Sequence, residues 1–197
     1  MNKRLLVVLM LVASALGCGS QSRALVGYQR DPIPNVDVVA LPSVETDGSE
    51  TDFSFRADGD GLLLVYFGYT SCPDVCPTTL SDVRRVLDNL DSGDSGRIDV
   101  AMVTVDPEVD TPEVLVGYTR SFVADAHVVR TTDSDQLEKA AEQFGASFDK
   151  QGSDVQHTGA LYGVDKDGNL LITWPYGVTA DDLESDIRYL LDEHIQG

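Results

Sequence analysis

The sequence predicts an α/β fold in which a mixed central sheet is flanked by helices and preceded by an N-terminal β-hairpin. First, segments with strand and helix patterns alternate through the middle of the chain, and a hairpin and a helix follow them. Second, a continuous apolar run from Leu62 to Phe67 is rich in β-forming residues, which is typical of a strand buried on both faces. With 197 residues, of which 42% are hydrophobic, the chain is long enough for one such domain and an appendage.

The turn that follows the apolar run contains two cysteines. The run ends at Gly68, Cys72 and Cys76 follow, and Pro77 then suits the first position of a helix, where a missing N–H costs nothing. A strand, a cysteine turn and a helix in this order are typical of a thioredoxin-like fold. Three residues separate the two thiols here, whereas thioredoxin-like redox motifs have two.

The N-terminal hairpin is predicted from two short strand patterns around a polar turn. We expect strands at Val36–Leu41 and Thr51–Phe55, with the turn at Thr46–Ser49 between them. A second turn, Asp58–Gly61, leads into the central strand.

Helix and strand patterns alternate after the cysteine turn. Apolar residues at helical spacing predict a helix from Pro77 to Leu90, and a second apolar run predicts a buried strand from Ile98 to Val105. Thr111, Pro112 and Glu113 provide a cap, an N1 proline and an early acid for a helix that ends near Val123. The remaining expected elements are a strand at His127–Arg130, a helix at Ser134–Phe144 ended by Gly145, a hairpin of Thr158–Val164 and Leu170–Trp174, and a closing helix at Thr179–Ile195.

The N-terminus has the pattern of an export signal of the lipoprotein type. Lys3 and Arg4 precede a short apolar run, and small residues then lead into Cys18. The run is too short for a membrane span, which needs about 20 apolar residues. We therefore expect residues 1–17 to be a signal peptide, residues 18–35 to be a lipidated Cys18 with a flexible tether, and residues 36–197 to be the domain. The predicted location is extracytoplasmic and membrane-anchored, on the cell surface or the periplasmic side; the alternative is a plain signal peptide cut nearby.

The charge balance is strongly acidic, with 33 Asp and Glu against 14 Lys and Arg and a net charge of −19. Binding to nucleic acid is disfavoured, because phosphate contacts require a basic surface. The acids are scattered along the chain, which favours a solvated surface suited to high salt over a docking patch for cationic partners.

The cysteine pair favours redox or metal chemistry. If Pro77 is the first helical residue, Cys76 is the N-cap, where the helix dipole favours the thiolate. The three intervening residues allow the two Cβ atoms to approach within about 4–5 Å. Such a pair suits soft Cu(I) or a reversible disulfide, whereas a purely structural disulfide across so small a loop gains little stability.

A third donor is expected from one of the three histidines. His157 follows a polar loop and precedes a strand, and in a thioredoxin-like sheet that loop faces the cysteines; His127 is expected to be structural and His194 to be on the surface. Two sulfurs and one nitrogen suit trigonal Cu(I), with room for a fourth donor in Cu(II), although Zn²⁺ also accepts this set with water. Asp74, between the thiols, and Asp106, after the neighbouring strand, are candidate outer residues of the site.

Three blocks of the sequence resemble the SCO/SenC family. The first runs from Phe67 to Leu80 and includes both cysteines, the second joins Val103–Pro107 to Asp110–Glu113, and the third is His157-Thr158-Gly159. The blocks follow the family order, and the resemblance covers residues 34–195. Three positions depart from the common pattern, and none of them removes a ligand: Ser71 in place of a histidine, Val109 in place of a basic residue and Gln156 in place of an acid.

The resemblance implies a membrane-tethered protein with a thioredoxin-like fold that binds copper through Cys72, Cys76 and His157. It also implies that the protein delivers copper to the binuclear copper site in a subunit of cytochrome c oxidase, or reduces the thiols of that site. Other copper carriers or thiol reductants are the remaining partners that it implies.

Two functions remain open at the level of the sequence. One is a copper-binding assembly factor that turns over no small molecule. The alternative is a thiol–disulfide oxidoreductase in which Cys72 and Cys76 are the catalytic redox couple without an obligatory metal. His157 distinguishes the two, because dithiol exchange does not need it and three-coordinate copper does. A peroxide-reducing enzyme is a weaker third reading, since it would use a lone activated thiol rather than a pair.

Overall fold

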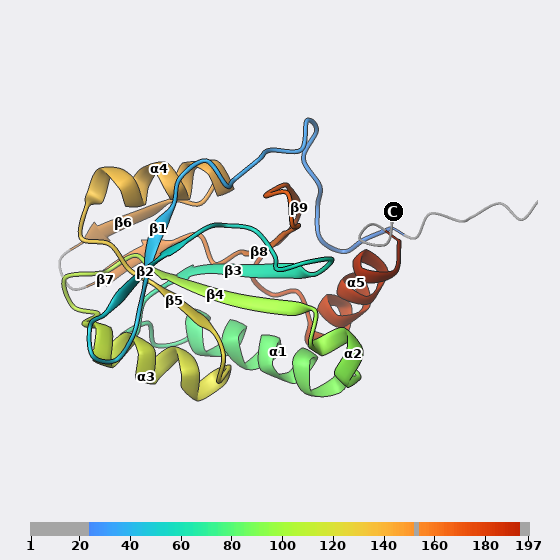
Figure 1. Cartoon of the computed structure of the whole chain (residues 1–197), viewed down its shortest axis with the longest axis horizontal. Coiled ribbons are helices and arrows are strands. Elements are labelled where there is room, and N and C mark those ends of the chain that lie inside the picture. Colours follow the sequence, from blue (N-terminus) through green and yellow to red (C-terminus); the bar gives the residue numbers. More distant parts are fainter. Residues whose placement is uncertain (1–23, 152–153, 194–197) are drawn as a thin grey trace, which may run out of the picture.

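A seven-stranded mixed sheet forms the centre of the computed structural model, which describes residues 24–151 and 154–193 (Figure 1). The strand order is β2-β1-β5-β4-β3-β8-β9, and β6 and β7 form a separate two-stranded ribbon. The strands are β1 Leu41–Val44, β2 Glu50–Phe53, β3 Leu62–Gly68, β4 Ile98–Thr104, β5 His127–Val129, β6 Phe148–Gln151, β7 Asp154–His157, β8 Leu161–Val164 and β9 Leu170–Trp174. The helices are α1 Val75–Asn89, α2 Ser92–Ser95, α3 Pro112–Phe122, α4 Ser134–Phe144 and α5 Ala180–Glu193. The predicted export signal, Cys18 and His194 lie outside the described residues.

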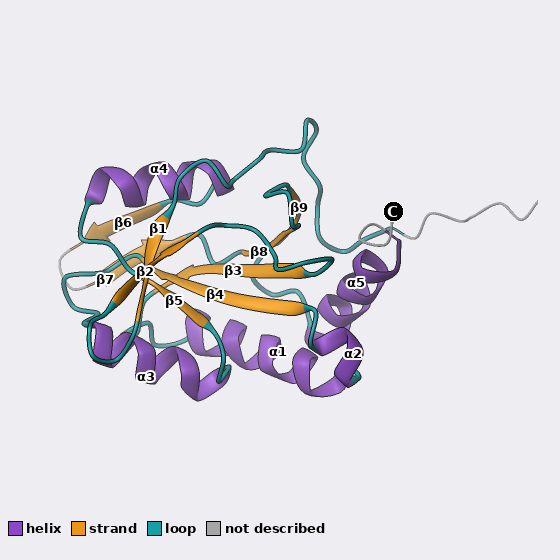
Figure 2. Ribbon diagram, viewed as in Figure 1, coloured by secondary structure: helices purple, strands orange, loops and turns teal. Residues whose placement is uncertain are grey.

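Helices cover both faces of the sheet (Figure 2). α4 lies on one face, and α1 and α3 lie on the other. α5 packs beside α1, where Arg85 Nη2 lies 2.8 Å from Asp181 Oδ1. This arrangement confirms the predicted mixed sheet flanked by helices with an N-terminal hairpin. Within the described residues, no helix has both the length and the apolar character that crossing a membrane requires.

The register of the central strands determines where the motifs meet. β3 and β4 are parallel, with Leu62 opposite Ile98 and Gly68 opposite Thr104, so the loops that follow the two strands leave the same edge of the sheet. β8 is antiparallel to β3, and its first residue, Leu161, lies opposite Tyr66. The segment just before β8 therefore reaches the same edge as the cysteine turn.

The buried core explains why the central strands were predictable. Every residue of β3 is buried, as the continuous apolar run predicts for a strand with helices on both sides. Next to β3, the rings of Phe67 and Phe144 meet edge to face at 5.2 Å, and the Phe144 and Tyr162 rings do so at 5.3 Å. These contacts join α4 to the sheet.

The first expected strand, at Val36–Leu41, is wrong in position: β1 begins where that strand was expected to end. Asn35 provides the reason, because its Oδ1 accepts a hydrogen bond from the Asp37 N–H and its Nδ2 donates to the Asp167 carbonyl. These bonds close a local turn, which competes with strand pairing. The hairpin therefore forms later along the chain, between β1 and β2.

Sequence patterns also missed the β6–β7 ribbon and placed the start of β8 three residues early. The two strands of the ribbon are four residues long each, too short for a clear alternation, and the segment before His157 was expected to be a polar loop. The chain before β8 cannot pair, because the Thr158 N–H bonds to the Ser147 carbonyl at the base of the ribbon. Gly159 then runs against α1: a Cβ at this position would lie 2.8 Å from a methyl of Val75.

The described part of the expected tether is packed against the domain. The Val26 and Gly27 N–H groups each lie 2.9 Å from Asp186 Oδ2, and the Trp174 indole N–H donates to the same oxygen at 3.0 Å. Tyr28 then pairs with Thr173 on the edge of β9, and Arg30 donates to a carbonyl at the end of α4. The carboxylate of Asp186 is fully buried, so these three N–H groups satisfy it.

We expect Asp186→Ala to lower the free energy of unfolding by about 2–4 kcal/mol, because three donors lose a charged acceptor inside the protein. Urea denaturation followed by circular dichroism measures the change. Asp192→Ala, at an exposed position of the same helix, is the control and should change stability by no more than about 0.5 kcal/mol. Equal effects of the two substitutions would contradict the anchoring role of Asp186.

Candidate metal centre

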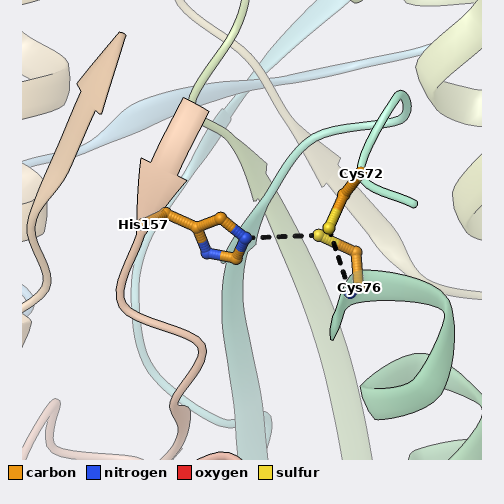
Figure 3. A group of neighbouring side chains, drawn as sticks. All are labelled: Cys72, Cys76 and His157. Atoms are coloured by element: carbon orange, nitrogen blue, oxygen red, sulfur yellow. Dashed lines mark hydrogen bonds between the residues drawn. The ribbon is translucent and has the colours of Figure 1, made fainter. Parts of the chain in front are cut away.

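The side chains of Cys72, Cys76 and His157 converge at the edge of the sheet (Figure 3). Cys72 lies in the loop after β3, Cys76 in the first turn of α1, and His157 at the end of β7. Their two sulfurs and one ring nitrogen all lie within 4.8 Å of one another, and Cys76 Sγ is 3.5 Å from His157 Nε2. Both cysteines are free thiols in this arrangement. It is the one such cluster of His, Cys, Asp and Glu among the described residues.

The start of α1 differs from the expectation for Cys76. The helix begins at Val75 with Asp74 as N-cap, so Cys76 is its second residue and Pro77 its third. Pro77 is tolerated there, because the first N–H groups of a helix have no intrahelical acceptor. The sulfur that sits at the helix N-terminus is that of Cys72, which accepts the Cys76 N–H at 3.4 Å. The expectation that Cys76 is the N-cap is therefore wrong.

The two thiols consequently have different acidities. Burial disfavours the thiolate of Cys72, but N–H groups of Cys76, Asp74 and Val75 bond its sulfur and bring its pKa below the ordinary value. Burial dominates at Cys76 and raises its pKa to about 12. The thiol that the helix N-terminus activates is thus Cys72, the opposite of the sequence-based prediction.

Gly68 allows the close packing behind the pair. A Cβ at this position would lie 2.6 Å from a ring carbon of Tyr66 and 3.0 Å from Cys76 Sγ. The end of β3 therefore has room for the aromatic ring and the sulfur only because this residue has no side chain.

The imidazole of His157 is oriented by aromatic and backbone contacts. Its ring meets Tyr66 and Tyr69 edge to face, with centroid distances of 6.1 and 5.6 Å. Nδ1 lies 3.3 Å from the Thr158 carbonyl, an arrangement that assigns the proton to Nδ1 and leaves the lone pair of Nε2 facing the cysteines. Burial lowers the pKa of His157, which favours the neutral ring that a metal requires.

A cavity of about 290 Å³ opens beside the donors, between the cysteine loop and the β6–β7 ribbon. Asp74 is exposed and lines this cavity together with Cys72 and His157, so it lies at the rim of the site. Asp106 does not join the donors: its carboxylate is buried against Lys150, whose Nζ lies 2.8 Å away. Neither carboxylate belongs to the cluster of donor atoms.

Asp110 is a residue of the site whose role was not foreseen. Its fully buried carboxylate accepts hydrogen bonds from the Thr70 hydroxyl at 2.5 Å, from the Thr70 N–H at 3.2 Å and from the Thr104 hydroxyl at 2.6 Å. Arg130 bonds the carbonyls of Asp110 and Pro107 at 2.8 Å each. The cysteine loop is thereby fixed to the end of β4. The position of Asp110 within the second motif block was the one signal of its importance in the sequence.

His127, the other histidine among the described residues, does not take part in this cluster of donors. His127 packs against Phe53 with ring centroids 4.9 Å apart, as expected of a structural residue.

We expect Cys72 to react with iodoacetamide well before Cys76 near pH 8. The thiolate is the nucleophile, and its fraction is larger where the pKa is lowered than where it is raised to about 12. Mass spectrometry of peptides from the reduced, metal-free protein measures both rates over a pH series. Urea-unfolded protein is the control, in which the two rates should become similar. Faster labelling of Cys76 in the folded protein would contradict the assignment.

Known proteins resemble this chain in sequence and in fold. The SCO1/SenC family model matches residues 46–192. A protein of Stutzerimonas stutzeri that is named as copper-binding is 32% identical over 139 residues, covering 70% of this chain and 66% of the relative. An SCO2-like protein of Rickettsia prowazekii is 31% identical over 131 residues, or 62% of each chain. The chain thus spans slightly less than two thirds of these relatives.

A solved structure gives the same result for the fold. The solution structure of apo Sco1 from Thermus thermophilus superimposes with a TM-score of 0.67 at 27% identity, covering 89% of this chain and 98% of the other. The agreement confirms the thioredoxin-like architecture that the cysteine turn predicted.

Proposed function

The chain belongs to the SCO1/SenC family, and we propose that it is an extracytoplasmic, membrane-anchored copper-binding protein. In this role it delivers copper to the binuclear copper site of cytochrome c oxidase, or prepares the thiols of that site. The observation that carries the proposal is the convergence of two cysteine sulfurs and a histidine nitrogen within 4.8 Å.

The donor set fits copper in chemistry and in spacing. Donors bound at about 2.0–2.3 Å from one ion lie roughly 3.5–4.5 Å apart, close to the separations found here. Two soft thiolates and one imidazole suit Cu(I), and the adjoining cavity leaves room for the further donor that Cu(II) accepts. Zn²⁺ accepts the same three donors, and the copper-binding relative favours copper.

Each of the three side chains has a distinct part in binding. Cys72 supplies the thiolate that forms most readily, at the helix N-terminus. Cys76 is buried and protonated at neutral pH, so it must release a proton when it binds the ion. His157 is neutral and presents Nε2. Acidification through the pKa of His157, which lies below the ordinary value of about 6.5, would remove this ligand.

The resemblance of the motif blocks to the family supports the choice of partner proteins. The proposed recipient is the copper-site subunit of cytochrome c oxidase. The other proposed partners are copper carriers, which would supply the ion, or thiol reductants, which would keep the cysteines reduced. The cavity beside Cys72 and His157 is the side from which a partner's ligands can reach the ion.

A second candidate function rests on the same pair of free thiols. Cys72 and Cys76 can form a disulfide by giving two electrons and two protons to a partner disulfide, which is reduced to two thiols. Copper binding needs the reduced pair, so the redox state of the thiols would control metal loading.

The proposed anchor is a lipid on Cys18, preceded by a signal peptide over residues 1–17 and followed by a tether that ends where Val26 docks on Asp186. Support comes from the basic, apolar and small residues that lead into Cys18. A lipidated N-terminus would hold the domain at a membrane surface.

We expect the Cys18→Ser protein, which keeps one thiol pair, to bind one equivalent of Cu(I) tightly in a competition titration. His157→Ala should weaken the affinity by about tenfold or more, since even outer-shell partners of metal ligands contribute 10- to 100-fold. The Cys72→Ser/Cys76→Ser double variant should lose tight binding. His127→Ala is the control and should bind as the parent does.

Other results of the titration would distinguish the copper function from the oxidoreductase. Tight binding that is indifferent to His157 would leave a two-thiol site and favour the oxidoreductase. No tight binding by the reduced parent protein would refute the copper function.

The membrane anchor has its own test. We expect the wild-type chain to enter the detergent phase in a detergent-partitioning experiment on expressing cells, and Cys18→Ser to remain in the aqueous phase. The physical reason is that the attached acyl chains provide the hydrophobic anchor. Partitioning of Cys18→Ser into detergent would contradict the lipoprotein assignment.

A further inference from the structure

The β6–β7 ribbon carries His157 but is not hydrogen-bonded into the seven-stranded sheet. Its register places Phe148 opposite His157 and Lys150 opposite Val155. Residues that oppose each other in an antiparallel pair, and residues two apart on one strand, point to the same side. These four side chains therefore share one face of the ribbon.

That face is the one that contacts the rest of the domain. His157 reaches Cys76, Val155 is buried, and Phe148 packs against the core. Lys150 Nζ lies 2.8 Å from Asp106 Oδ1 and 2.8 Å from Glu108 Oε2, both in the loop that follows β4. The ribbon is thus held by the metal ligand, by apolar packing and by a double ion pair.

Two open clefts border the ribbon. The cavity of about 290 Å³ is lined by β7 and the cysteine loop, and a second cavity of about 370 Å³ lies between β6, the loop after β4 and the start of α4. A ribbon with open space on two sides is not fixed by close packing alone. The ion pairs made by Lys150 are therefore well placed to define its position.

Asp106 is the fixed end of this ion-pair cluster. Its side chain is 7% exposed, its N–H bonds the Thr104 hydroxyl at 3.0 Å, and its carbonyl accepts the Asp110 N–H at 2.9 Å. Glu108 is 81% exposed, so solvent and salt screen its attraction for Lys150 much more. The buried ion pair with Asp106 provides the specific contact, and the exposed ion pair with Glu108 adds to it.

We propose that Lys150 is a positioning residue of the metal centre, which clamps the β6–β7 ribbon to the loop after β4 and thereby holds His157 Nε2 beside Cys76. The inference rests on the proposed copper function, because the position of His157 matters for binding only if the three donors share an ion. Without the clamp, the ribbon moves away from the cysteine loop more often. The site then offers two thiols in place of three donors.

The test compares Lys150→Met, which removes the charge and keeps the length, with Lys150→Arg, which restores a cation. In the Cys18→Ser background, Lys150→Met should weaken Cu(I) binding by about 10- to 100-fold, the range for outer-shell partners of metal ligands. Lys150→Arg should recover most of the loss. Glu108→Gln keeps the buried ion pair between Lys150 and Asp106, so it should cause a smaller loss of copper affinity. It is the second variant if Lys150→Met folds poorly.

A matched control is available in Lys166→Met. Lys166 Nζ also lies 2.8 Å from a carboxylate oxygen, that of Asp60, but in the turn between β8 and β9, at the edge of the sheet away from the cysteines. Its loss should leave copper affinity unchanged. In the metal-free protein, amide hydrogen exchange in β6 and β7 should be faster in Lys150→Met than in either the parent or Lys166→Met.

Combination with His157→Ala decides whether Lys150 acts through the histidine. If it does, Lys150→Met causes no further loss of affinity once His157 is absent. An equal loss in both backgrounds, a loss matched by Lys166→Met, or no loss at all would overturn the inference. Failure of the parent protein to bind copper would refute the proposed function instead, so the two failures are distinguishable.

Discussion

The arrangement of the metal centre depends on the hydrogen bonds that the buried carboxylate of Asp110 accepts. Parallel pairing of β3 and β4 brings Gly68 beside Thr104, and Asp110 then joins the hydroxyls of Thr70 and Thr104 across the two strand ends. A charged acceptor with several short hydrogen bonds inside the protein fixes geometry more firmly than apolar contact does. The loop that carries Cys72 starts from this point, and so does the loop that carries Asp106.

The two thiols show how one helix start can create two environments. Cys72 accepts hydrogen bonds from N–H groups at the N-terminus of α1, while Cys76, four residues on, has its sulfur packed behind Tyr66 and Gly68. The thiol of Cys72 is therefore the more reactive one, and the thiol of Cys76 stays protonated until an ion or a partner displaces the proton. Such a difference would suit the proposed function, in which the site accepts and releases copper in steps.

Local sequence signals predicted the central strands, α3, β9 and the cysteine pair, because apolar runs, caps and residue chemistry act over short distances. His157 was predicted from its place in a thioredoxin-like sheet. Local signals failed where a distant group decides the structure. The packing of Val26 depends on Asp186, and the position of His157 depends on a ribbon whose inward face includes Lys150. The start of α1 was missed because proline is tolerated at its third residue as well as at its first. Asp110 stayed hidden, since its role depends on strand register.

The link between the N-terminal segment and α5 also bears on how the chain acquires its fold. Val26 meets its acceptor 160 residues later, so this end of the domain cannot close until nearly the whole polypeptide has been synthesised. Contacts so distant in sequence form slowly, because a long loop must be closed first. We therefore expect the docking of this N-terminal segment on α5 to be among the last steps of folding.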